Sequence, residues 1–353
     1  MNVEHEFWRT PAAAPDAAWR ERARARQDEL TKPAGSLGRL EELAIFMAAA
    51  QGCDRPAVER VNIAVFVADH GIAAAGVSAF PQAVTVQMIS NLAHGGAAIS
   101  VLAKQLAADM EIINLGTAVA APALVNVRDA VIAAGTASFL HGPAMTAAQY
   151  RQALAAGRDA AARAQAAGCQ LFIGGEVGIA NTTAAAAVAC ALLDEAPVRL
   201  AGPGTGLDRD GLQHKVDVLE QALAQHRDAL VDADAILQYL GGFEIVALTG
   251  AYVHCAQQGL PVLIDGYISS IAALAAARLC AGADHWFLYG HNSAEPGHAR
   301  VLATLAGRPL LDLDMRLGEG SGAATAVPLL RLACALHNDM ATFAEAEIAG
   351  RCD

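Results

Sequence analysis

The sequence predicts an α/β protein in which a mostly parallel sheet is flanked by helices, and three observations lead to this prediction. First, apolar runs rich in β-branched residues, such as Val61–Ala68, recur along the chain and are typical of strands buried on both faces. Second, most of these runs are followed by a glycine-containing loop and then by an alanine-rich helical stretch. Third, the chain has 353 residues, of which 54% are hydrophobic and 17% are charged, so a sizeable core is available.

The elements are expected in a definite order. Two helices come first, over Asp16–Leu30 and Leu37–Gln51; the second has apolar residues at helical spacing, and Ser36 is its predicted N-cap. Six apolar runs are then predicted to be strands: Val61–Ala68, Met110–Leu115, Asp129–Ala134, Gln170–Ile173, Pro261–Ile264 and His285–Leu288. One or two helices are expected over residues 323–347.

This order indicates a large α/β domain over residues 56–322, with a Rossmann-like sheet and the active-site loops. Residues 1–55 and 323–353 are predicted to form a small helical domain to which both chain termini contribute. In open parallel sheets the ligand lies at the carboxyl ends of the strands, so chemistry is expected in the glycine-rich loops that follow them.

The composition of the chain, and the motifs that it lacks, argue against several classes of function. The net charge of −12 and the lack of a Lys/Arg-rich run argue against a nucleic-acid surface. No signal region opens the sequence, and the apolar runs reach only about half of the ~20 residues that a membrane helix needs. The chain has seven cysteines, the last of which is Cys352, and no two of them form a C-x-x-C pair. We therefore expect reduced thiols in a cytoplasmic protein. P-loop, dinucleotide-binding G-x-G-x-x-G and G-x-S-x-G motifs are lacking, which disfavours ATP hydrolysis, hydride transfer and α/β-hydrolase chemistry.

Two glycine-rich loops are candidates for binding an anion. Gly174–Thr183 contains Glu176 and closely spaced glycines whose N–H groups can face a phosphate; the alternative is an ordinary strand-to-helix turn with a capping box. Gly202–Asp208 has three glycines in five residues and precedes Lys215. This lysine either supplies a point charge to a phosphate or is a solvated helix residue.

A third loop, His291–His298, follows the last predicted strand. Ser293 and the neighbouring backbone are candidates for anion binding, whereas His291, Glu295 and His298 suggest a metal site. The spacing of these three residues matches no helical ligand motif, and a proline interrupts them, so a metal is not expected.

The fourth loop, Arg316–Gly322, places Glu319 between two glycines and before an apolar helix. Partial desolvation raises the pKa of such a carboxyl and makes it a better base near neutral pH. The alternative is a glutamate that stabilises a helix N-terminus. A separate segment, Gly76–Gln87, combines an aromatic ring, a proline and two amides in an apolar context, as expected for the wall of a flat pocket.

Nine short segments match, in order, the motifs of one known family. They are KPAGSLGRLEELA from Lys32, ADHG from Ala68, GVSAFPQAVTVQM from Gly76, GGAAISVLA from Gly95, GEVGIANTTAAAA from Gly175, GPGTGLD from Gly202, GGFEI from Gly241, DGYI from Asp265 and LDLDMRLGEGSGAA from Leu311. Each is weak alone, but the ordered set resembles the nicotinate-nucleotide–dimethylbenzimidazole phosphoribosyltransferase family. At Ala180 this sequence departs from the glycine common in the family, and at Asn114 and Pro203 from Asp and Arg.

The resemblance implies a homodimer that converts nicotinate mononucleotide and 5,6-dimethylbenzimidazole into α-ribazole 5′-phosphate and nicotinate. It also implies that Glu319 is the general base. The implied ribose and phosphate positions are Glu176, Gly178, Gly204, Lys215 and Ser293, and those near the incoming base are Ser78, Phe80, Gln82 and Gln87.

This chemistry suits the residues, because nicotinate leaves with its ring nitrogen neutral and one carboxylate base is sufficient. No pyrophosphate leaves, so neither a metal nor a cofactor is expected. Two alternatives stay open: transfer to another acceptor such as adenine or a phenol, and a nucleotide-binding sensor without turnover. A metal-dependent hydrolase built on Asp69, His70, His291 and His298 is a more distant one.

Overall fold

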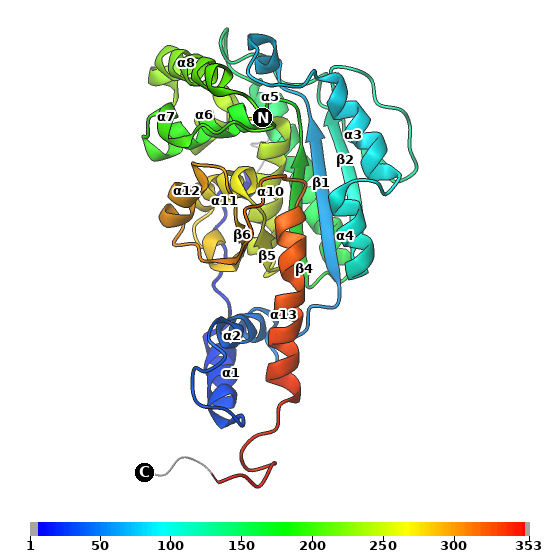
Figure 1. Ribbon diagram of the computed structural model, residues 1–353, viewed down its shortest axis with the longest axis vertical. Helices are drawn as coiled ribbons and strands as arrows, with labels where there is room; N and C mark the ends of the chain where they lie inside the picture. The colour runs from blue at the N-terminus through cyan, green and yellow to red at the C-terminus, as the bar shows by residue number, and fades with distance from the viewer. Residues whose placement is uncertain (1–5, 350–353) are drawn as a thin grey trace.

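The computed structural model describes residues 6–349, and its centre is a sheet of seven parallel strands (Figure 1). The strands are β1 (Val61–Ala68), β2 (Asp109–Gly116), β3 (Val127–Asp129), β4 (Leu171–Val177), β5 (Val262–Ile264), β6 (Phe287–Asn292) and β7 (Pro309–Asp312). Their order in the sheet is β3-β2-β1-β4-β5-β6-β7. The all-parallel sheet confirms the predicted α/β class.

The strand order changes direction between β1 and β4. From β1 the chain builds outward through β2 to β3, and it then returns to the other side of β1 and continues from β4 to β7. A switch point of this kind leaves a crevice at the carboxyl ends of the two strands, which is where open α/β sheets bind ligands.

Three predicted strands agree closely with the structure, and three differ. β1, β2 and β5 lie within a residue of their predicted bounds. β4 extends past Ile173 because Gly174 and Gly175 belong to the strand rather than to the loop. The predicted strand at 285–288 begins later, because a 3-10 helix (Ala283–Trp286) precedes β6.

The two edges of the sheet were harder to predict. The run Asp129–Ala134 is strand only at its first residue, since β3 ends there and the chain then turns away. β7 was not predicted at all. It has four residues, begins with a proline and is polar at its end, as is typical of an edge strand.

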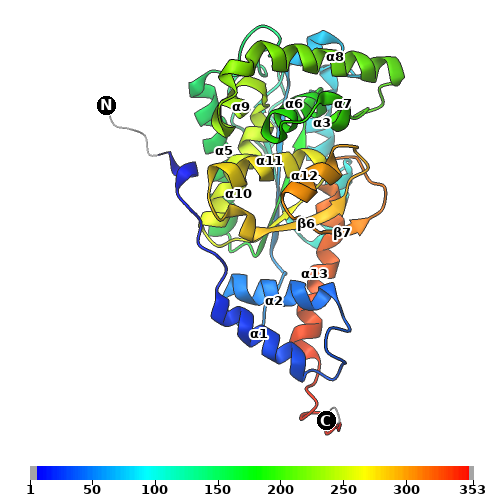
Figure 2. The ribbon, with the colours of Figure 1, turned by 90° about the vertical axis from the view of Figure 1, so that its left-hand side faces the viewer.

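Helices cover both faces of the sheet (Figures 1 and 2). In β1, Phe66 joins the core with α5 (Ala147–Ala166), α6 (Asn181–Leu193), α10 (Phe243–Gln257) and α11 (Tyr267–Leu279). Its neighbour Val65 joins the core of the other face with α3 (Ala83–Ala93), α4 (Ala98–Leu106) and α13 (Ser321–Asp339). The other described α-helices beside the sheet are α7 (Pro197–Leu200), α8 (Arg209–His226), α9 (Ala233–Leu240) and α12 (His298–Thr304). Among the described helices, none is long and apolar enough to cross a membrane.

The first two α-helices and the end of α13 lie together beyond one end of the sheet (Figure 2). α1 (Ala17–Glu29) is capped by Asp16, whose carboxylate accepts the backbone N–H groups of Ala18 and Trp19. The prediction that Ser36 caps α2 (Arg39–Gln51) is wrong. The N-cap position is Gly38, whose φ of 53° favours glycine, so the chain enters the helix after the turn in which Ser36 lies.

The predicted C-terminal helical region is the single helix α13, which ends at Asp339, and residues 340–347 form turns. α13 begins beside β6 and α4 and ends on α2, so it joins the sheet to the terminal helices. The domain boundaries at 55/56 and 322/323 stay predictions. Residues 1–5 and 350–353 of the predicted small domain, including Cys352, lie outside the described residues.

Two glycines allow α5 and α10 to pack at very close range. A Cβ atom on Gly157 of α5 would lie 1.8 Å from the Ala247 carbonyl oxygen, and one on Gly250 of α10 would lie 2.2 Å from the Leu154 carbonyl oxygen. Both contacts are with backbone atoms, which cannot rotate away. The helix pair therefore requires glycine at these two positions.

We expect Gly157→Ala to lower the free energy of unfolding by about 1–3 kcal/mol, because the two helices must separate to admit the methyl group. The matched control is Gly142→Ala, where an added Cβ meets no atom within 4 Å. Urea unfolding of both variants checks this. A Gly157→Ala protein as stable as the wild type would contradict the close-packing argument.

Candidate active site

A cavity of about 490 Å³ opens at the carboxyl ends of β4, β5 and β6. Its walls come from five segments and the start of α3. Four of the segments contribute residues 176–179, 181, 182, 265–269, 291, 293, 295 and 316–319. Two more cavity residues, Gly204 and Thr205, come from the predicted anion loop before α8. The cavity therefore lies where the sheet topology predicts a ligand, beside the switch point.

Three long helices, α6, α11 and α13, begin at this cavity. Asn181 and Thr182 open α6 and line the wall, as do Tyr267, Ile268 and Ser269 of α11. α13 begins directly after the cavity residue Glu319. The first N–H groups of a helix and its dipole create positive potential. In a protein with a net charge of −12, these helix ends provide a place for an anion.

Glu319 lies on a backbone turn that packs closely against strand β4. Its φ of 65° is in the left-handed region, and the flanking Gly318 and Gly320 also have positive φ. A Cβ on Gly175 of β4 would lie 2.1 Å from the Glu319 carbonyl oxygen, so glycine in the strand lets the turn approach the sheet. The structure thus places the predicted base at the cavity wall, in a strained conformation of the kind found at functional sites.

The surroundings of the Glu319 carboxyl favour its neutral form. The side chain is buried, and one oxygen accepts the backbone N–H of Ile99 at 3.3 Å. Burial, followed by the negative charge of Asp265, raises the pKa of Glu319 above its ordinary value. A carboxylate in this environment is a stronger proton acceptor than one in water.

Two further carboxyl groups share this corner of the cavity. Glu176, at the end of β4, accepts a hydrogen bond from the Asn181 side chain. Burial and the charges of Asp265, Glu244 and Glu319 raise the pKa of Glu176 well above its usual range. Gly318 leaves room for this side chain, since a Cβ there would lie 2.5 Å from a Glu176 oxygen. Protonation of one group in the cluster therefore affects the others.

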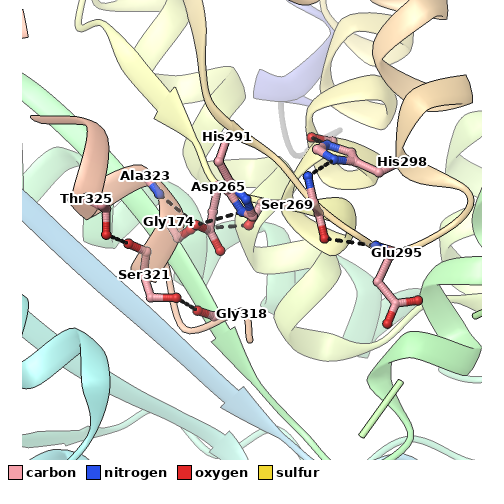
Figure 3. Close-up of polar contacts among 12 residues, drawn as sticks. Gly174, Asp265, Ser269, His291, Glu295, His298, Gly318, Ser321, Ala323 and Thr325 are labelled. Atoms are coloured by element: carbon pink, nitrogen blue, oxygen red, sulfur yellow. Dashed lines mark hydrogen bonds and ion pairs between the residues drawn. The ribbon is translucent and has the colours of Figure 1, made fainter. Parts of the chain in front are cut away.

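Asp265 connects β5 to the starts of α11 and α13 (Figure 3). One of its oxygens accepts the backbone N–H of Ala323 at 2.8 Å, and His291 Nε2 lies 3.7 Å from the same oxygen. His291 fits against Gly322, where a Cβ would lie 2.0 Å from the imidazole. Both Asp265 and His291 line the cavity, although the sequence pattern assigned no role to the DGYI segment that contains Asp265.

Lys215 is completely buried, so the alternative of a solvated helix lysine is wrong. Its ammonium group donates to the Thr182 hydroxyl at 2.9 Å and to the Gly202 carbonyl at 3.0 Å. Burial lowers the pKa of Lys215 to about 8, and the charge of Glu295 opposes this shift. Lys215 is not among the lining residues; it lies behind Thr182 and ties α6 to the glycine-rich loop.

The other predicted nucleotide positions lie on the cavity wall. Gly178, Gly204 and Ser293 all line it. Glycine is required at Gly178, since a Cβ there would lie 2.2 Å from the Ala68 carbonyl oxygen, and Gly204 has a φ of 54°. Sequence reasoning missed Arg316 as a site residue; it lines the cavity mouth and donates to the Gly204 carbonyl at 3.2 Å.

The predicted base-pocket residues fall in different places. Phe80 lines the cavity. Ser78 accepts the backbone N–H of Phe80 at 3.4 Å, and Gln82 donates to the His70 carbonyl at 3.1 Å; neither lines the cavity. Gln87 is exposed and also lies off the wall.

Val84, Thr85 and Met88 of α3 line the cavity instead. Helical periodicity would have found them, since these positions share a face that Gln87 does not. Thr85 also donates to Asp69 at 2.6 Å and accepts the Ile179 N–H at 3.1 Å, which fixes the loop after β4.

The suspected metal-binding group does not assemble. His298 uses both ring nitrogens inside the protein, with Ser293 N at 2.8 Å and Ser270 Oγ at 2.9 Å. Over residues 6–349, no group of three or more His, Cys, Asp or Glu side chains is arranged to hold a metal ion.

Comparison with known proteins places this chain among phosphoribosyltransferases. A family model described as "DBI_PRT: Phosphoribosyltransferase" matches residues 12–348. The chain is 58% identical over 349 residues to the nicotinate-nucleotide–dimethylbenzimidazole phosphoribosyltransferase of Pseudomonas syringae pv. syringae (strain B728a), covering 99% of each chain. It is 58% identical over 346 residues to the enzyme of the same name from Pseudomonas aeruginosa (strain UCBPP-PA14), covering 98% of this chain and 99% of that one.

A solved structure is similar as well. The crystal structure of nicotinate-nucleotide–dimethylbenzimidazole phosphoribosyltransferase from Thermus thermophilus superposes with a TM-score of 0.90 at 41% identity. The match covers 95% of this chain and 100% of that chain. The similarity therefore extends over nearly the whole chain.

Ala180 has a backbone conformation that favours glycine. It is the residue before α6, it is buried, and its φ of 73° is left-handed. We expect Ala180→Gly to raise the free energy of unfolding by about 0.5–1 kcal/mol. The left-handed conformation costs a non-glycine residue roughly 1–2 kcal/mol. Glycine removes this cost, but its greater conformational freedom in the unfolded chain offsets part of the gain. The contrasting variant is Ala184→Gly in the same helix, which should be less stable than the wild type. Thermal unfolding that ranks both variants below the wild type would contradict this.

Proposed function

Because this chain belongs to the nicotinate-nucleotide–dimethylbenzimidazole phosphoribosyltransferase family, we propose that it transfers the phosphoribosyl group of nicotinate mononucleotide to 5,6-dimethylbenzimidazole. The products are α-ribazole 5′-phosphate and nicotinate. The observation that carries the mechanism is the position of Glu319. This buried carboxylate of raised pKa lies on the wall of the cavity at the carboxyl ends of β4, β5 and β6, beside the N-termini of α6, α11 and α13.

The bond changes require one proton acceptor. A nitrogen of the benzimidazole attacks the anomeric carbon as the bond to the nicotinate ring nitrogen breaks, and nicotinate keeps the electron pair of that bond. The second benzimidazole nitrogen then loses its proton to Glu319. Attack from the face opposite nicotinate inverts the β-nucleotide to the α-product. The remaining contribution of the protein is to position the two substrates.

We assign the nucleotide phosphate to the wall formed by α6, Gly178, Gly204 and Ser293. Backbone N–H groups at the start of α6 face this region, and Lys215 fixes it from behind through Thr182 and Gly202. Glu176 is the candidate for binding a ribose hydroxyl, since its carboxyl lies on the wall between this region and Glu319.

We assign the flat base to the apolar wall of Phe80, Val84 and Met88, which faces the cavity from α3 and the preceding turn. Ser78 and Gln82 would support this wall, because they hold the turn on which Phe80 lies. Gln87 is exposed, so its proposed contact with the base requires a shift of α3.

We also propose that the enzyme is a cytoplasmic homodimer. The six described cysteines are free thiols, as in a reducing compartment. Exposed apolar side chains at Val125, Val131, Leu313 and Leu317 are surface that a second copy would cover. The mass of the protein in solution tests the dimer; a monomer at working concentration contradicts it.

The activity is tested by incubating purified protein with nicotinate mononucleotide and 5,6-dimethylbenzimidazole, without added metal, and identifying products by chromatography and mass. α-Ribazole phosphate with equimolar nicotinate is the expected result. Nucleotide binding without product, followed by turnover with adenine or a phenol, would instead assign another acceptor. Binding without turnover of any acceptor would favour a sensor.

Glu319→Gln should lower kcat by about 10²-fold or more, because the isosteric amide cannot accept the proton. The matched control is Glu220→Gln on α8, an exposed position away from the cavity, which should leave kcat unchanged. Steady-state kinetics with both substrates checks this. Turnover by Glu319→Gln close to that of the wild type would rule out the assignment.

The pH profile provides a second test of the same group. Glu319 must be ionised to act as a base, and burial raises its pKa above the ordinary value of a glutamate, so kcat/KM should fall as the pH drops through this raised pKa. The residual activity of Glu319→Gln should lack this acid limb. The same limb in both proteins would assign it to another group, such as Glu176.

Lys215→Met should raise the KM for nicotinate mononucleotide by about tenfold, because it removes the hydrogen bonds that hold Thr182 and Gly202 while keeping the length of the buried side chain. Lys104→Met, at an exposed position of α4, is the control. An unchanged KM in Lys215→Met would contradict the proposal that this lysine supports the phosphate-binding region.

A further inference from the structure

We propose that His298 is a positioning residue that holds the main chain of Ser293 at the cavity wall as a neutral imidazole of fixed tautomer. This inference rests on the proposed function, since Ser293 belongs to the nucleotide region. It assigns a role to the one histidine of the His291–His298 loop that is fully buried and lies off the cavity wall.

The hydrogen bonds of His298 determine where its proton lies. The backbone N–H of Ser293 donates to Nδ1 at 2.8 Å, so Nδ1 carries no hydrogen. In a neutral ring the proton is then on Nε2, which donates to the Ser270 hydroxyl oxygen of α11 at 2.9 Å. Both nitrogens are occupied, so the ring is available neither as a base nor as a metal ligand.

Burial maintains this state at working pH. The ring is fully buried, and burial together with the neighbouring His291 lowers the pKa of His298 to about 3. Protonation would place a hydrogen on Nδ1 facing the Ser293 N–H, which would break the contact. The ring therefore stays uncharged over the pH range in which the pKa of Glu319 sets the activity.

His298 is one part of a short hydrogen-bonded loop that faces the ligand. The Glu295 N–H donates to the Ser293 hydroxyl oxygen at 3.3 Å, and the His298 N–H donates to the Glu295 carbonyl at 3.0 Å. Because the Ser293 hydroxyl already accepts within the loop, its own proton is free to donate into the cavity. The Ala294 N–H donates to the Met315 carbonyl at 3.0 Å, which connects this loop to the segment that leads to Glu319.

Two substitutions at His298 test the hydrogen bonds of the two ring nitrogens one at a time. In asparagine, Oδ1 is as many bonds from Cβ as Nδ1 is in histidine, so His298→Asn keeps the acceptor for Ser293 and loses the contact with Ser270. In glutamine, Nε2 is as many bonds from Cβ as the histidine Nε2, so His298→Gln keeps the contact with Ser270 and loses the acceptor. A residue that only fills space would respond equally to both changes.

We expect His298→Gln to raise the KM for nicotinate mononucleotide about tenfold with kcat and the KM for dimethylbenzimidazole nearly unchanged, as loss of one positioning hydrogen bond implies. His298→Asn should raise the nucleotide KM by only about threefold, because it loses the Ser270 contact but keeps the acceptor for Ser293. Equal nucleotide KM values in the two variants, or changes that follow their melting temperatures, would overturn the inference.

A second measurement is independent of catalysis. Hydrogen exchange of the Ser293 amide should be slow in the wild type and in His298→Asn and fast in His298→Gln. Failure of the proposed function would remove turnover from the wild type but leave this pattern intact, whereas equal exchange in both variants would reject the role of His298.

If the glutamine variant does not fold, Ser270→Ala keeps the imidazole ring and removes its second partner. This variant should still raise the nucleotide KM by about threefold, and no change would contradict the proposal.

Discussion

The contact between the Glu319 turn and β4 is the constraint on which the rest of the site depends. The turn reaches the strand only because Gly175 has no side chain, and Gly318 and Gly320 allow the backbone to reverse on either side. This contact places a buried carboxylate next to Glu176 and starts α13 at the cavity. The strain of a left-handed glutamate is therefore part of the structure that holds the proposed base in place.

The cavity combines a negative cluster with a positive rim, and the proposed reaction uses the two for different purposes. The charges of Asp265 and Glu319 add to burial in raising the pKa of Glu176, and the charge of Asp265 also raises the pKa of Glu319. The ends of α6, α11 and α13 supply positive potential without adding mobile side chains. Under the proposed function, an acidic protein can in this way bind a phosphorylated substrate and still keep a carboxylate as its base.

Buried side chains on and behind the cavity wall maintain this geometry. Lys215, Thr85 and His298 each bond to main-chain or hydroxyl groups of a cavity loop. Lys215 and His298 do not line the cavity themselves. Loops of this kind have few apolar contacts of their own, so buried hydrogen bonds determine their position.

The sequence by itself determined the α/β class, the central strands and the loop that carries Glu319. Apolar runs and glycine-rich turns are local signals, and the ordered motifs indicated the family. Only the tertiary structure revealed Asp265, Arg316 and the α3 face of Val84, Thr85 and Met88 as cavity residues. It also placed Lys215 behind the wall and gave His298 two protein partners. Such facts depend on which distant segments meet across the sheet, and periodicity within one segment does not contain that information.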